Sequence, residues 1–437
     1  MTEVACRCQW PRIASLSIIG LICIASPQAT AVATVQGNAT RTILEGHEML
    51  EQAQAVVDTL VTLRRAIHRR PELGFHEFET AQLVAQTLES LGLRVDTGVG
   101  KTGVIGYLGQ DGPTVAIRAD MDALPIQEQN DVSYASQIPG VMHACGHDAH
   151  TAMAFGAARL LNETEMPGQV RFLFQPSEER CDEEGKSGAA RLVEDGAMRG
   201  VDAIVALHVE PRLETGQINV AAGPICAAAD AFQAIIIGEG CHGAFPHLGV
   251  DPIFISAQVI SAIQGIVARH LDPTQPAVVT IGSIHGGTAG NVIPSEVVLK
   301  GTIRSLDEKL RCQIRLELER ALAISRALGG DFRLEVGEGY PVLVNDEQVA
   351  ELIREVGSDL LGVDSVHIEE PEMGAEDFSF LASEAPGAMF SLGVKHKGRT
   401  DVRPLHSPDF DIDEGSLPIG AAILAETAQR YLLDKSG

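Results

Sequence analysis

The chain has 437 residues, 45% hydrophobic and 21% charged, which is the composition of an ordinary globular protein long enough for two domains. Its 33 basic and 59 acidic side chains give a formal net charge of −26 at pH 7. A charge this negative argues against a protein that binds nucleic acid or an anionic membrane surface.

The N-terminus differs in composition from the rest of the chain. Arg7 and Arg12 precede an apolar run over residues 13–25, and small residues follow up to Ala33. A basic start, a short apolar centre and a small-x-small site are typical of a cleavable secretory signal, which we place at residues 1–33. The alternative is an uncleaved membrane anchor, but the run is shorter than the roughly 20 apolar residues that span a bilayer. We therefore expect an exported protein, periplasmic or secreted, without stable membrane insertion.

Removal of this signal leaves five cysteines, namely Cys145, Cys181, Cys226, Cys241 and Cys312. An odd number at irregular spacing does not make a complete disulfide framework. At least one thiol is therefore expected to be free or bound to metal. A disulfide between Cys181 and Cys241, formed in an oxidising compartment, is a further hypothesis.

Hydrophobic periodicity predicts alternating helices and strands over most of the chain. Apolar residues recur at helical spacing over residues 47–67 and 80–91. Short apolar runs predict buried strands at residues 115–117, 170–174, 203–207 and 388–392. Helix-like stretches lie between them at residues 150–161 and 188–196. This alternation indicates an α/β fold, with a mostly parallel sheet and helices on both faces.

Residues 224–337 have a different order of elements. The pattern predicts a strand, a helix, two strands, a helix and a strand, at residues 231–237, 251–269, 277–284, 297–304, 307–328 and 332–336. The order β-α-β-β-α-β is that of a ferredoxin-like unit. We therefore predict one domain formed by residues 41–223 and 338–437, interrupted by a smaller ferredoxin-like α+β domain at residues 224–337.

Potential metal ligands are densest between residues 143 and 150. This segment holds His143, Cys145, His147, Asp148 and His150. Thiolate and imidazole are good donors to Zn²⁺ and similar ions. A structural zinc site would need two more ligands at short spacing, and no Cys-x-x-Cys pair lies in this segment. The alternative is a polar loop with helix-capping and core histidines.

Other potential ligands lie where predicted strands stop or shortly after. Glu178 and Glu179 follow the second predicted strand, His208 ends the third, and His406 comes just before the last helix. Ligands of open α/β sheets gather outside the carboxyl ends of the strands. This coincidence favours a metal site over a polar loop.

Two adjacent carboxylates suit a division of labour at such a site. One of Glu178 and Glu179 can bind a metal ion while the other accepts a proton from a metal-bound water, whose pKa the metal lowers. The alternative is a solvated surface pair. For the flanking Asp182, Glu183 and Glu184, the solvated-surface alternative stays open.

Supporting and substrate-binding side chains are also suggested by position. Asp122 follows the first predicted strand and can hold a metal-binding imidazole from behind, although a turn or helix cap is nearly as good an explanation. In the predicted inserted domain, Asn291 and Arg304 can hold a substrate carboxylate, and His242 can stabilise an oxyanion. Taken singly, the loops around His242 and Asn291 are ordinary Gly- and Pro-rich turns.

Together these segments resemble a known metallopeptidase family, that of aminoacylase, carboxypeptidase G and succinyl-diaminopimelate desuccinylase. Within it, the chain is most similar to the branch of hippurate hydrolases, N-acyl-amino-acid amidohydrolases and auxin-conjugate hydrolases. The resemblance covers residues 47–430. Its motifs lie at residues 71–75, 118–125, 142–148, 174–179, 373–378 and 405–408, and in the loops around His242 and Asn291.

The resemblance implies a catalytic domain interrupted by a lid domain, and a centre with two divalent metal ions (Mn²⁺, Zn²⁺, Co²⁺ or Ni²⁺). The matching metal ligands are Cys145, His147, Glu179, His208 and His406. Glu178 matches the general base that activates a metal-bridging water and passes its proton to the leaving amine.

The resemblance also implies substrate contacts and a quaternary structure. Asp122 matches a supporting aspartate, and His242, Asn291 and Arg304 match lid residues that contact substrate. A homodimer through the lid domain is expected. Residues 180–187 depart from the short Gly-rich link of relatives and put the substrate preference, more than the catalysis, in doubt.

We therefore expect a metal-dependent amidohydrolase that cleaves the amide bond of N-acyl amino acids or of small dipeptides. An exported solute-binding protein on an inactive version of the fold is the alternative, but the complete set of ligands with Glu178 argues against it. A thiol hydrolase with Cys145 as nucleophile is a third and weaker alternative. It predicts inactivation by alkylating agents and indifference to chelators.

Overall fold

The structure is a computed structural model that describes residues 46–436. The predicted secretory signal at residues 1–33 lies outside the described residues.

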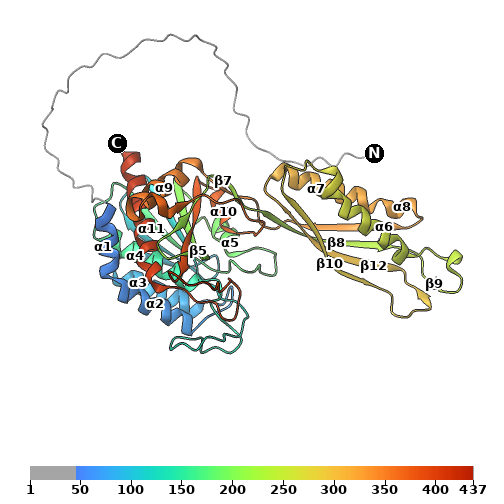
Figure 1. Ribbon diagram of the computed structural model, residues 1–437, viewed down its shortest axis with the longest axis horizontal. Helices are drawn as coiled ribbons and strands as arrows, with labels where there is room; N and C mark the ends of the chain where they lie inside the picture. Colours follow the sequence, from blue (N-terminus) through green and yellow to red (C-terminus); the bar gives the residue numbers. More distant parts are fainter. Residues whose placement is uncertain (1–45, 437) are drawn as a thin grey trace, which may run out of the picture. The chain divides into compact units, whose positions relative to one another are not determined.

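An eight-stranded sheet forms the larger part of the fold (Figure 1). In spatial order its strands are β1 (Arg94–Val99), β2 (Gly103–Gly109), β4 (Gln169–Gln175), β3 (Thr114–Asp120), β5 (Ala203–Glu214), β16 (Gly387–Lys395), β6 (Ile218–Asn219) and β15 (Val366–His367). The central strands β4, β3, β5 and β16 run parallel, whereas β1, β2 and β6 add antiparallel pairings. The mostly parallel sheet predicted from the sequence is confirmed, and its four predicted strands are these central four.

The central strands are buried on both faces, which explains their continuous apolar runs. Val115 and Ile117 of β3 belong to one hydrophobic core, and Ala116 between them belongs to a second core on the opposite face. The sequence pattern did not reveal β1 and β2. β1 is an edge strand with mostly exposed polar residues, so it lacks the apolar signature of a buried strand.

Helices cover both faces of this sheet. The first core is closed by α1 (Gly46–Ala55), α2 (Val57–Arg69), α3 (Phe78–Ser90), α4 (His147–Asn162), α9 (Glu347–Leu361) and α11 (Leu417–Ser436). The second is closed by α5 (Gly188–Glu194) and α10 (Phe378–Ala382). The single helix predicted at residues 47–67 is instead two helices, because the chain makes a turn at Val56.

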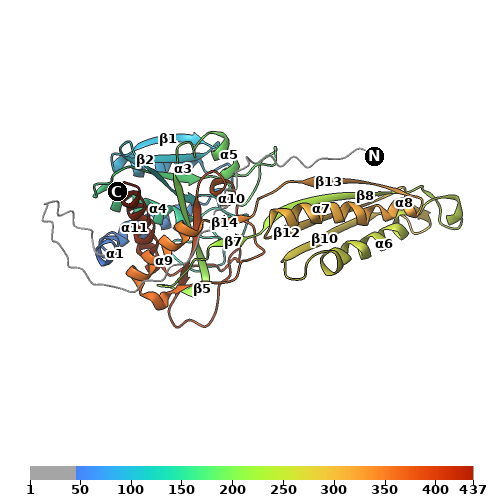
Figure 2. The same cartoon turned by 90° about the horizontal axis from the view of Figure 1, so that it is seen from above.

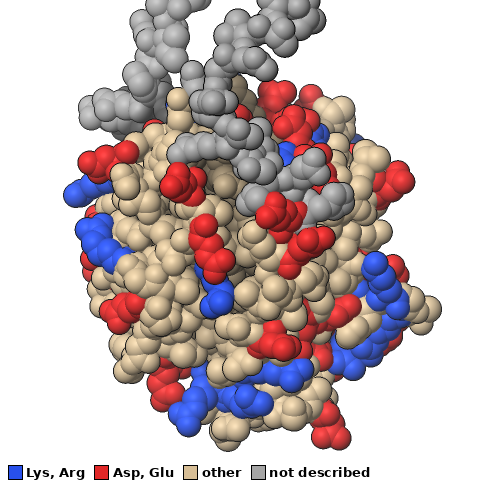
Figure 3. All heavy atoms as spheres, turned by 90° about the vertical axis from the view of Figure 1, so that its left-hand side faces the viewer, with Lys and Arg blue, Asp and Glu red and all other residues tan. Residues whose placement is uncertain are grey.

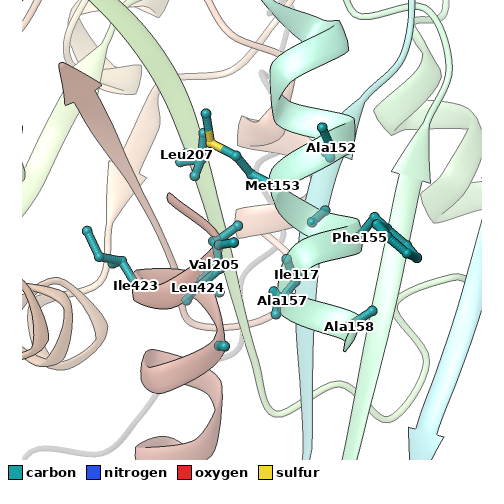
Figure 4. Close-up of a cluster of buried hydrophobic side chains, with 14 of the residues drawn as sticks. Ile117, Ala152, Met153, Phe155, Ala157, Ala158, Val205, Leu207, Ile423 and Leu424 are labelled. Atoms are coloured by element: carbon teal, nitrogen blue, oxygen red, sulfur yellow. The ribbon is translucent and has the colours of Figure 1, made fainter. Parts of the chain in front are cut away.

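Two helices of the first core approach each other closely (Figure 4). Met153 and Ala157 of α4 and Leu424 of α11 pack over the strand residues Ile117 and Val205. Glycines permit the approach: a Cβ on Gly156 would lie 2.7 Å from Cβ of Ala421, and one on Gly420 would lie 2.2 Å from Sδ of Met153. Because α4 begins at His147, this packing also fixes where His147, and Cys145 just before the helix, lie.

A second, four-stranded sheet lies between residues 228 and 337 (Figure 2). Its elements in chain order are β8 (Ala228–Ile237), α6 (Pro252–Gly265), β10 (Ala277–Gly286), β12 (Glu296–Ser305), α7 (Glu308–Leu322), α8 (Ile324–Ala327) and β13 (Asp331–Gly337). The strand order is β10-β12-β8-β13, and every neighbouring pair is antiparallel. The predicted ferredoxin-like β-α-β-β-α-β unit is confirmed.

This second sheet has a hydrophobic core of its own, formed with α6 and α7. Asp251 and Asp307 cap these two helices: Asp251 accepts the backbone N–H groups of Ile253 and Phe254, and Asp307 accepts that of Leu310. With the π-helical turn at Ile266–His270, α6 is long and apolar enough to cross a membrane. However, its residues Ile255, Val259 and Ile263 are buried against the sheet, so we assign it as a core helix.

Short elements complete the fold. The strands β9 (Cys241–His242) and β11 (Val292–Ile293) form one pair, and β7 (Gly223–Cys226) and β14 (Leu343–Asn345) form another. Single 3₁₀ turns lie at Pro246–Leu248, Val363–Ser365 and Glu414–Ser416. On the face shown in Figure 3, acidic and basic side chains are interspersed with uncharged ones.

We refer to residues 46–226 and 343–436 as the large-sheet region and to residues 228–337 as the small-sheet region. The domain boundaries at residues 223/224 and 337/338 stay a prediction.

Candidate metal centre

Cys145 and His147 lie at the start of α4, on either side of a glycine that the local geometry requires. Gly146 has φ 89°, in the left-handed region, and a Cβ there would lie 2.4 Å from Cγ2 of Val209. His147 is the first residue of α4, and its side chain is fully buried. The turn therefore directs both side chains into the interior behind the carboxyl ends of the central strands.

Glu178 and Glu179 follow β4 and are held by the carboxylate of Asp122. The backbone N–H of Glu178 donates to Oδ1 of Asp122 (3.0 Å), and that of Glu179 donates to Oδ2 (3.1 Å). Nδ1 of His147 lies 2.9 Å from the carbonyl oxygen of Asp122 and 3.1 Å from its Oδ1. Both oxygens are acceptors here, so Nδ1 carries the proton and Nε2 of His147 is left to face the centre. Asp122 therefore contacts His147, Glu178 and Glu179, and its role as their support stays a prediction.

His208 reaches the same place from within β5. The prediction that it ends a strand was wrong, because β5 continues to Glu214. Its neighbour β3 pairs with β5 only as far as Ala206, so His208 still lies just past the end of that ladder. Nδ1 of His208 lies 2.9 Å from the carbonyl oxygen of Val209, which again leaves Nε2 free to act as a ligand.

His406 comes from the loop before α11. It has φ 60°, and its backbone N–H donates to the carbonyl oxygen of Ala144 (2.8 Å), which ties this loop to the segment that carries Cys145. Nε2 of His406 lies 3.0 Å from Oε1 of Glu179 and 3.3 Å from Sγ of Cys145.

These side chains converge on one point. Potential ligand atoms lie within 4.8 Å of one another in the groups Cys145/His147/His208, Cys145/Glu179/His406 and His147/Glu178/Glu179. Sγ of Cys145 is shared by two groups and lies 3.4 Å from Nε2 of His208. One thiol, three imidazole nitrogens and adjacent carboxylates are a donor set suited to zinc-like divalent ions.

A cavity of about 850 Å³ opens onto this convergence point. Cys145, Glu178, Glu179, His208 and His406 line it from the large-sheet region, and Arg304 lines it from β12 of the small-sheet region. His242 and Asn291, predicted to contact substrate, are not among its lining residues. They lie at the β9/β11 pair, where Nδ1 of His242 accepts the backbone N–H of Ala244.

Comparison with known proteins agrees with this geometry. The family model of peptidase family M20/M25/M40 matches residues 116–430. The chain belongs to this family. It is 41% identical to thermostable carboxypeptidase 2 of Saccharolobus solfataricus, over 88% of this chain and 98% of that protein. It is also 41% identical to the IAA-amino acid hydrolase ILR1-like 4 of Arabidopsis thaliana, over 86% of each chain.

A solved structure of the same family is also similar. It is the YXEP protein of Bacillus subtilis, described as a dinuclear metal binding peptidase from the M20 family. It superposes with a TM-score of 0.76 at 35% identity, covering 87% of this chain and 99% of that one. The protein is therefore a hydrolase of the M20 family that acts on amides, and the ligand clusters together with this relative support a centre for two divalent metal ions.

The charges around this M20 centre favour bound cations. Burial raises the pKa of the Cys145 thiol well above its usual value; His147 opposes this shift, and the charges of Glu179 and Glu178 add to it. A thiolate at this depth therefore needs added positive charge, which a divalent ion supplies. Burial, Glu376 and Asp377 likewise raise the pKa of Glu178. Burial also acts to raise the pKa of Glu179, but the hydrogen bond with His406 and the charges of His147 and His406 together outweigh it, so the pKa of Glu179 is lowered.

The other histidines of the segment at residues 143–150, His143 and His150, do not belong to the three ligand groups named above. Nε2 of His150 accepts the backbone N–H of Val209 (3.0 Å), and its Nδ1 lies 2.6 Å from Oδ1 of Asp120, so His150 supports the centre as a neutral ring. Burial lowers the pKa of His150 to about 4 and that of His143 to about 3. Asp148 instead pairs with Arg64 (2.7 Å).

Sequence reasoning missed several buried partners of these residues. Asp120 lies within ligand distance of His147 and His150, and Arg118 pairs with Asp120, Glu376 and Asp377. The hydroxyl of Tyr340 donates to the carbonyl oxygen of Glu178 (2.8 Å). The carboxylates Glu376 and Asp377 lie in a motif that supported the resemblance, which was the one available signal for them.

Part of the acidic loop after Glu179 is held by ion pairs. The side chain of Asp182 is only 2% exposed and pairs with Lys101 and Arg191 (2.6 Å each), so the surface alternative is wrong for this residue. Glu183 and Glu184 are exposed. Cys181 and Cys241 are both free thiols, so the structure does not contain the hypothesised disulfide.

Proposed function

We propose that this M20 hydrolase cleaves the amide bond between an acyl group and an amino acid, or the peptide bond of a small dipeptide. The observation that carries the proposal is the convergence of five potential ligands and Glu178 at one end of a cavity that Arg304 lines as well. The names of the relatives, an IAA-amino acid hydrolase and a carboxypeptidase, support a substrate with a free carboxylate next to the scissile amide.

Cys145, His147, Glu179, His208 and His406 are the proposed ligands of two divalent ions, with Mn²⁺, Zn²⁺, Co²⁺ and Ni²⁺ as candidates. When bound, such ions polarise a carbonyl oxygen and lower the pKa of a water molecule. Glu178 is the proposed general base: it takes the proton of the attacking water and delivers it to the leaving amine. Asp122 positions Glu178, Glu179 and His147 through the hydrogen bonds described above.

Substrate binding is assigned to the small-sheet region. Arg304 lines the cavity, and its guanidinium can hold the substrate carboxylate by two parallel hydrogen bonds. We retain His242 and Asn291 as proposed substrate contacts, but they require movement of this region or a second copy of the chain, because neither lines the cavity.

A homodimer through the small-sheet region is part of this proposal. The exposed apolar side chains Phe245, Leu248 and Phe254 lie near His242 in sequence, and large exposed apolar patches are typical of protein–protein contacts. Sedimentation of the purified protein tests it, and a monomer at all concentrations would count against the dimer. We also propose export after removal of residues 1–33, and N-terminal sequencing of secreted protein checks that cleavage.

A substrate panel tests the reaction itself. The chelator-treated protein is reloaded separately with Zn²⁺, Mn²⁺, Co²⁺ and Ni²⁺ and incubated with N-acyl amino acids and dipeptides, while amino acid release is measured. We expect release with at least one metal and none without metal. Amides that lack the free α-carboxylate are the matched control and should be poor substrates. Binding of N-acyl amino acids without turnover under every metal would instead indicate an inactive, solute-binding protein.

A further inference from the structure

The motif at residues 71–75 and the two residues that follow it have no role in the proposed reaction. This segment lies between α2 and α3 and runs beside the residues that carry Asp122. The backbone N–H of Ala123 donates to the carbonyl oxygen of Glu72 (2.8 Å), and Leu73 and Ala123 form a parallel bridge. The segment therefore lies against the part of the large-sheet region that supports Glu178 and Glu179.

The carboxylate of Glu77 contacts the turn that directly precedes Glu178 and Glu179. It precedes α3, but its side chain makes no capping hydrogen bond with the helix, and the residue is fully buried. Its Oε1 accepts the backbone N–H of Ser177 (2.8 Å), and its Oε2 accepts the hydroxyl of Thr102 (2.5 Å). A buried carboxylate is costly unless it is well hydrogen-bonded, so this placement needs an explanation beyond packing.

Ser177 is in a conformation that non-glycine residues rarely adopt. Its φ is 44°, in the left-handed region, and it directly precedes Glu178. Such a conformation persists only where the surroundings hold it. Here the Ser177 hydroxyl donates to the carbonyl oxygen of Arg180 (2.9 Å), Gly188 donates to the Ser177 carbonyl oxygen (2.9 Å), and Glu77 accepts the Ser177 N–H.

Two carboxylates, one on each side, therefore fix the turn that carries the proposed base. Glu77 holds residue 177, and Asp122 holds residues 178 and 179. If the Glu77 contact is lost, Ser177 can relax towards an ordinary conformation, and rotation at this one residue redirects the Glu178 side chain that follows it.

Gly74 leaves room for this arrangement. A Cβ on Gly74 would lie 2.2 Å from Oγ of Ser177 and 2.8 Å from Cγ of Arg180. Any larger residue at position 74 would therefore push the Ser177 turn away from Glu77.

We infer that Glu77 is a positioning residue for Glu178: its carboxylate holds Ser177 in the left-handed conformation that directs Glu178 into the cavity, and Gly74 provides the space for that turn. The inference rests on the role proposed for Glu178. It is distinct from the role of Asp122, because Glu77 touches neither Glu178 nor a proposed metal ligand directly.

Kinetics of Glu77→Ala and Glu77→Gln test the inference. For Glu77→Ala we expect kcat to fall about 10- to 100-fold, as small misplacements of catalytic groups do, with KM changed less than about 2-fold and the bound metal retained. Glu77→Gln should retain most of kcat, because its amide oxygen can still accept the Ser177 N–H. Glu79→Ala, which changes an exposed carboxylate on α3, is the control and should keep kcat close to that of the parent.

Hydrogen exchange gives a readout that does not depend on turnover. Mass spectrometry of a peptide that covers residues 175–181 should show faster exchange in Glu77→Ala than in the parent protein or in Glu79→Ala. The peptides of β3 and β5 should exchange as in the parent. Faster exchange throughout the protein would indicate a general stabilising role and overturn the inference.

A second pair of variants approaches the turn from the opposite side. Gly74→Ala should reproduce the kcat loss, since the new Cβ collides with Ser177. Adding Ser177→Gly removes Oγ and Cβ of Ser177 and tolerates positive φ, which leaves only the contact with Cγ of the flexible Arg180 side chain. The double variant should therefore recover several-fold in kcat over Gly74→Ala. No recovery would overturn the steric part of the inference.

The outcomes separate this inference from the proposed function. Unchanged kcat in Glu77→Ala, or equal losses in the Ala and Gln variants, would overturn the positioning role. A parent protein that hydrolyses none of the panel would refute the proposed function instead, and the hydrogen-exchange comparison would still decide whether Glu77 holds the Ser177 turn.

Discussion

The two regions differ in where they bury charge. In the large-sheet region the carboxyl ends of the central strands enclose a continuous polar network, with Arg118, Asp120, Asp122, His147, His150, Glu178 and Asp377 all buried. In the small-sheet region the core beneath the helices is apolar, and its buried ionic contacts are concentrated on Asp230, which pairs with Arg311 and Arg315.

From this difference we infer that the large-sheet region holds the reacting groups and that the small-sheet region contributes to substrate binding. A buried network in which each group is held by others keeps reacting side chains in place, and interactions fixed in this way are the ones that stabilise a transition state. The small-sheet region places Arg304 at the cavity, which Asp230 lines as well, but among the described residues the Arg304 side chain makes no ion pair that would tie it into such a network. We therefore expect changes in the large-sheet network to alter kcat or metal content, and changes in the small-sheet region to alter KM or stability.

Replacing the proposed base should have the largest effect. Glu178→Gln keeps the size of the side chain but removes the proton acceptor, so we expect kcat to fall by about 10²- to 10⁴-fold, in the range of general-base losses. Bound metal, measured by mass spectrometry of the metals, should stay the same. The exposed carboxylate Glu183, five residues on, provides the control Glu183→Gln, which should be as active as the parent. Retained activity in Glu178→Gln would refute its role.

Loss of the shared thiol should be the next largest effect. Cys145 belongs to two of the ligand groups, so Cys145→Ala should lose at least one metal ion per chain and most of its activity, with added metal restoring little. Cys226→Ala is the matched control, because Cys226 lines the same cavity but belongs to none of those groups. An unchanged metal content in Cys145→Ala would remove it from the ligand set.

The sequence indicated the side chains that converge at the candidate site better than it indicated the residues that support them. Cys145, His147, Glu178, Glu179 and His406 lie at or beyond the ends of central elements, so residue type and strand position together indicated them. His208 was found for a partly wrong reason, since the pattern showed the apolar half of β5 but not its continuation to Glu214.

Contacts between distant segments were beyond the sequence pattern. Glu77 and Ser177 are 100 residues apart, and Tyr340 meets the Glu178 carbonyl across 162 residues. Local periodicity carries no information on such pairs. Two local features were missed for a different reason. The edge strand β1 is polar and exposed, and the single turn at Val56 between α1 and α2 does not interrupt the apolar pattern.

A substitution at the cavity-lining Arg304 of the small-sheet region should mainly weaken substrate binding. Arg304→Ala removes a charge-assisted contact to the substrate carboxylate, so we expect KM to rise about 10- to 100-fold with kcat within a few-fold of the parent. Arg333→Ala, an exposed cation on β13 of the same sheet, is the control and should change neither constant. A loss confined to kcat would mean that Arg304 acts on the transition state, and the division of tasks between the regions would then be wrong.

The smallest effect should be in the acid stability of the small-sheet region. Burial raises the pKa of Asp230, but Arg311 and Arg315 outweigh it and hold the pKa below the ordinary value. The stability gained from these pairs is therefore present above the unfolded pKa of about 4 and is lost as pH falls through the lower folded pKa.

The variant Arg315→Gln lessens this pKa shift of Asp230. Because Arg315 is partly exposed, we expect the variant to lower the free energy of unfolding by about 1 kcal/mol or less at pH 6. Urea unfolding should show this difference shrinking as pH falls below about 4, where Asp230 is protonated first in the unfolded chain and then, at lower pH, in the folded protein. Arg326→Gln, which alters an exposed pair with Asp331, should match the parent at every pH. A pH-independent difference for Arg315→Gln would show that Arg315 contributes through packing of its aliphatic stem, and Asp230 would then be held by Arg311 alone.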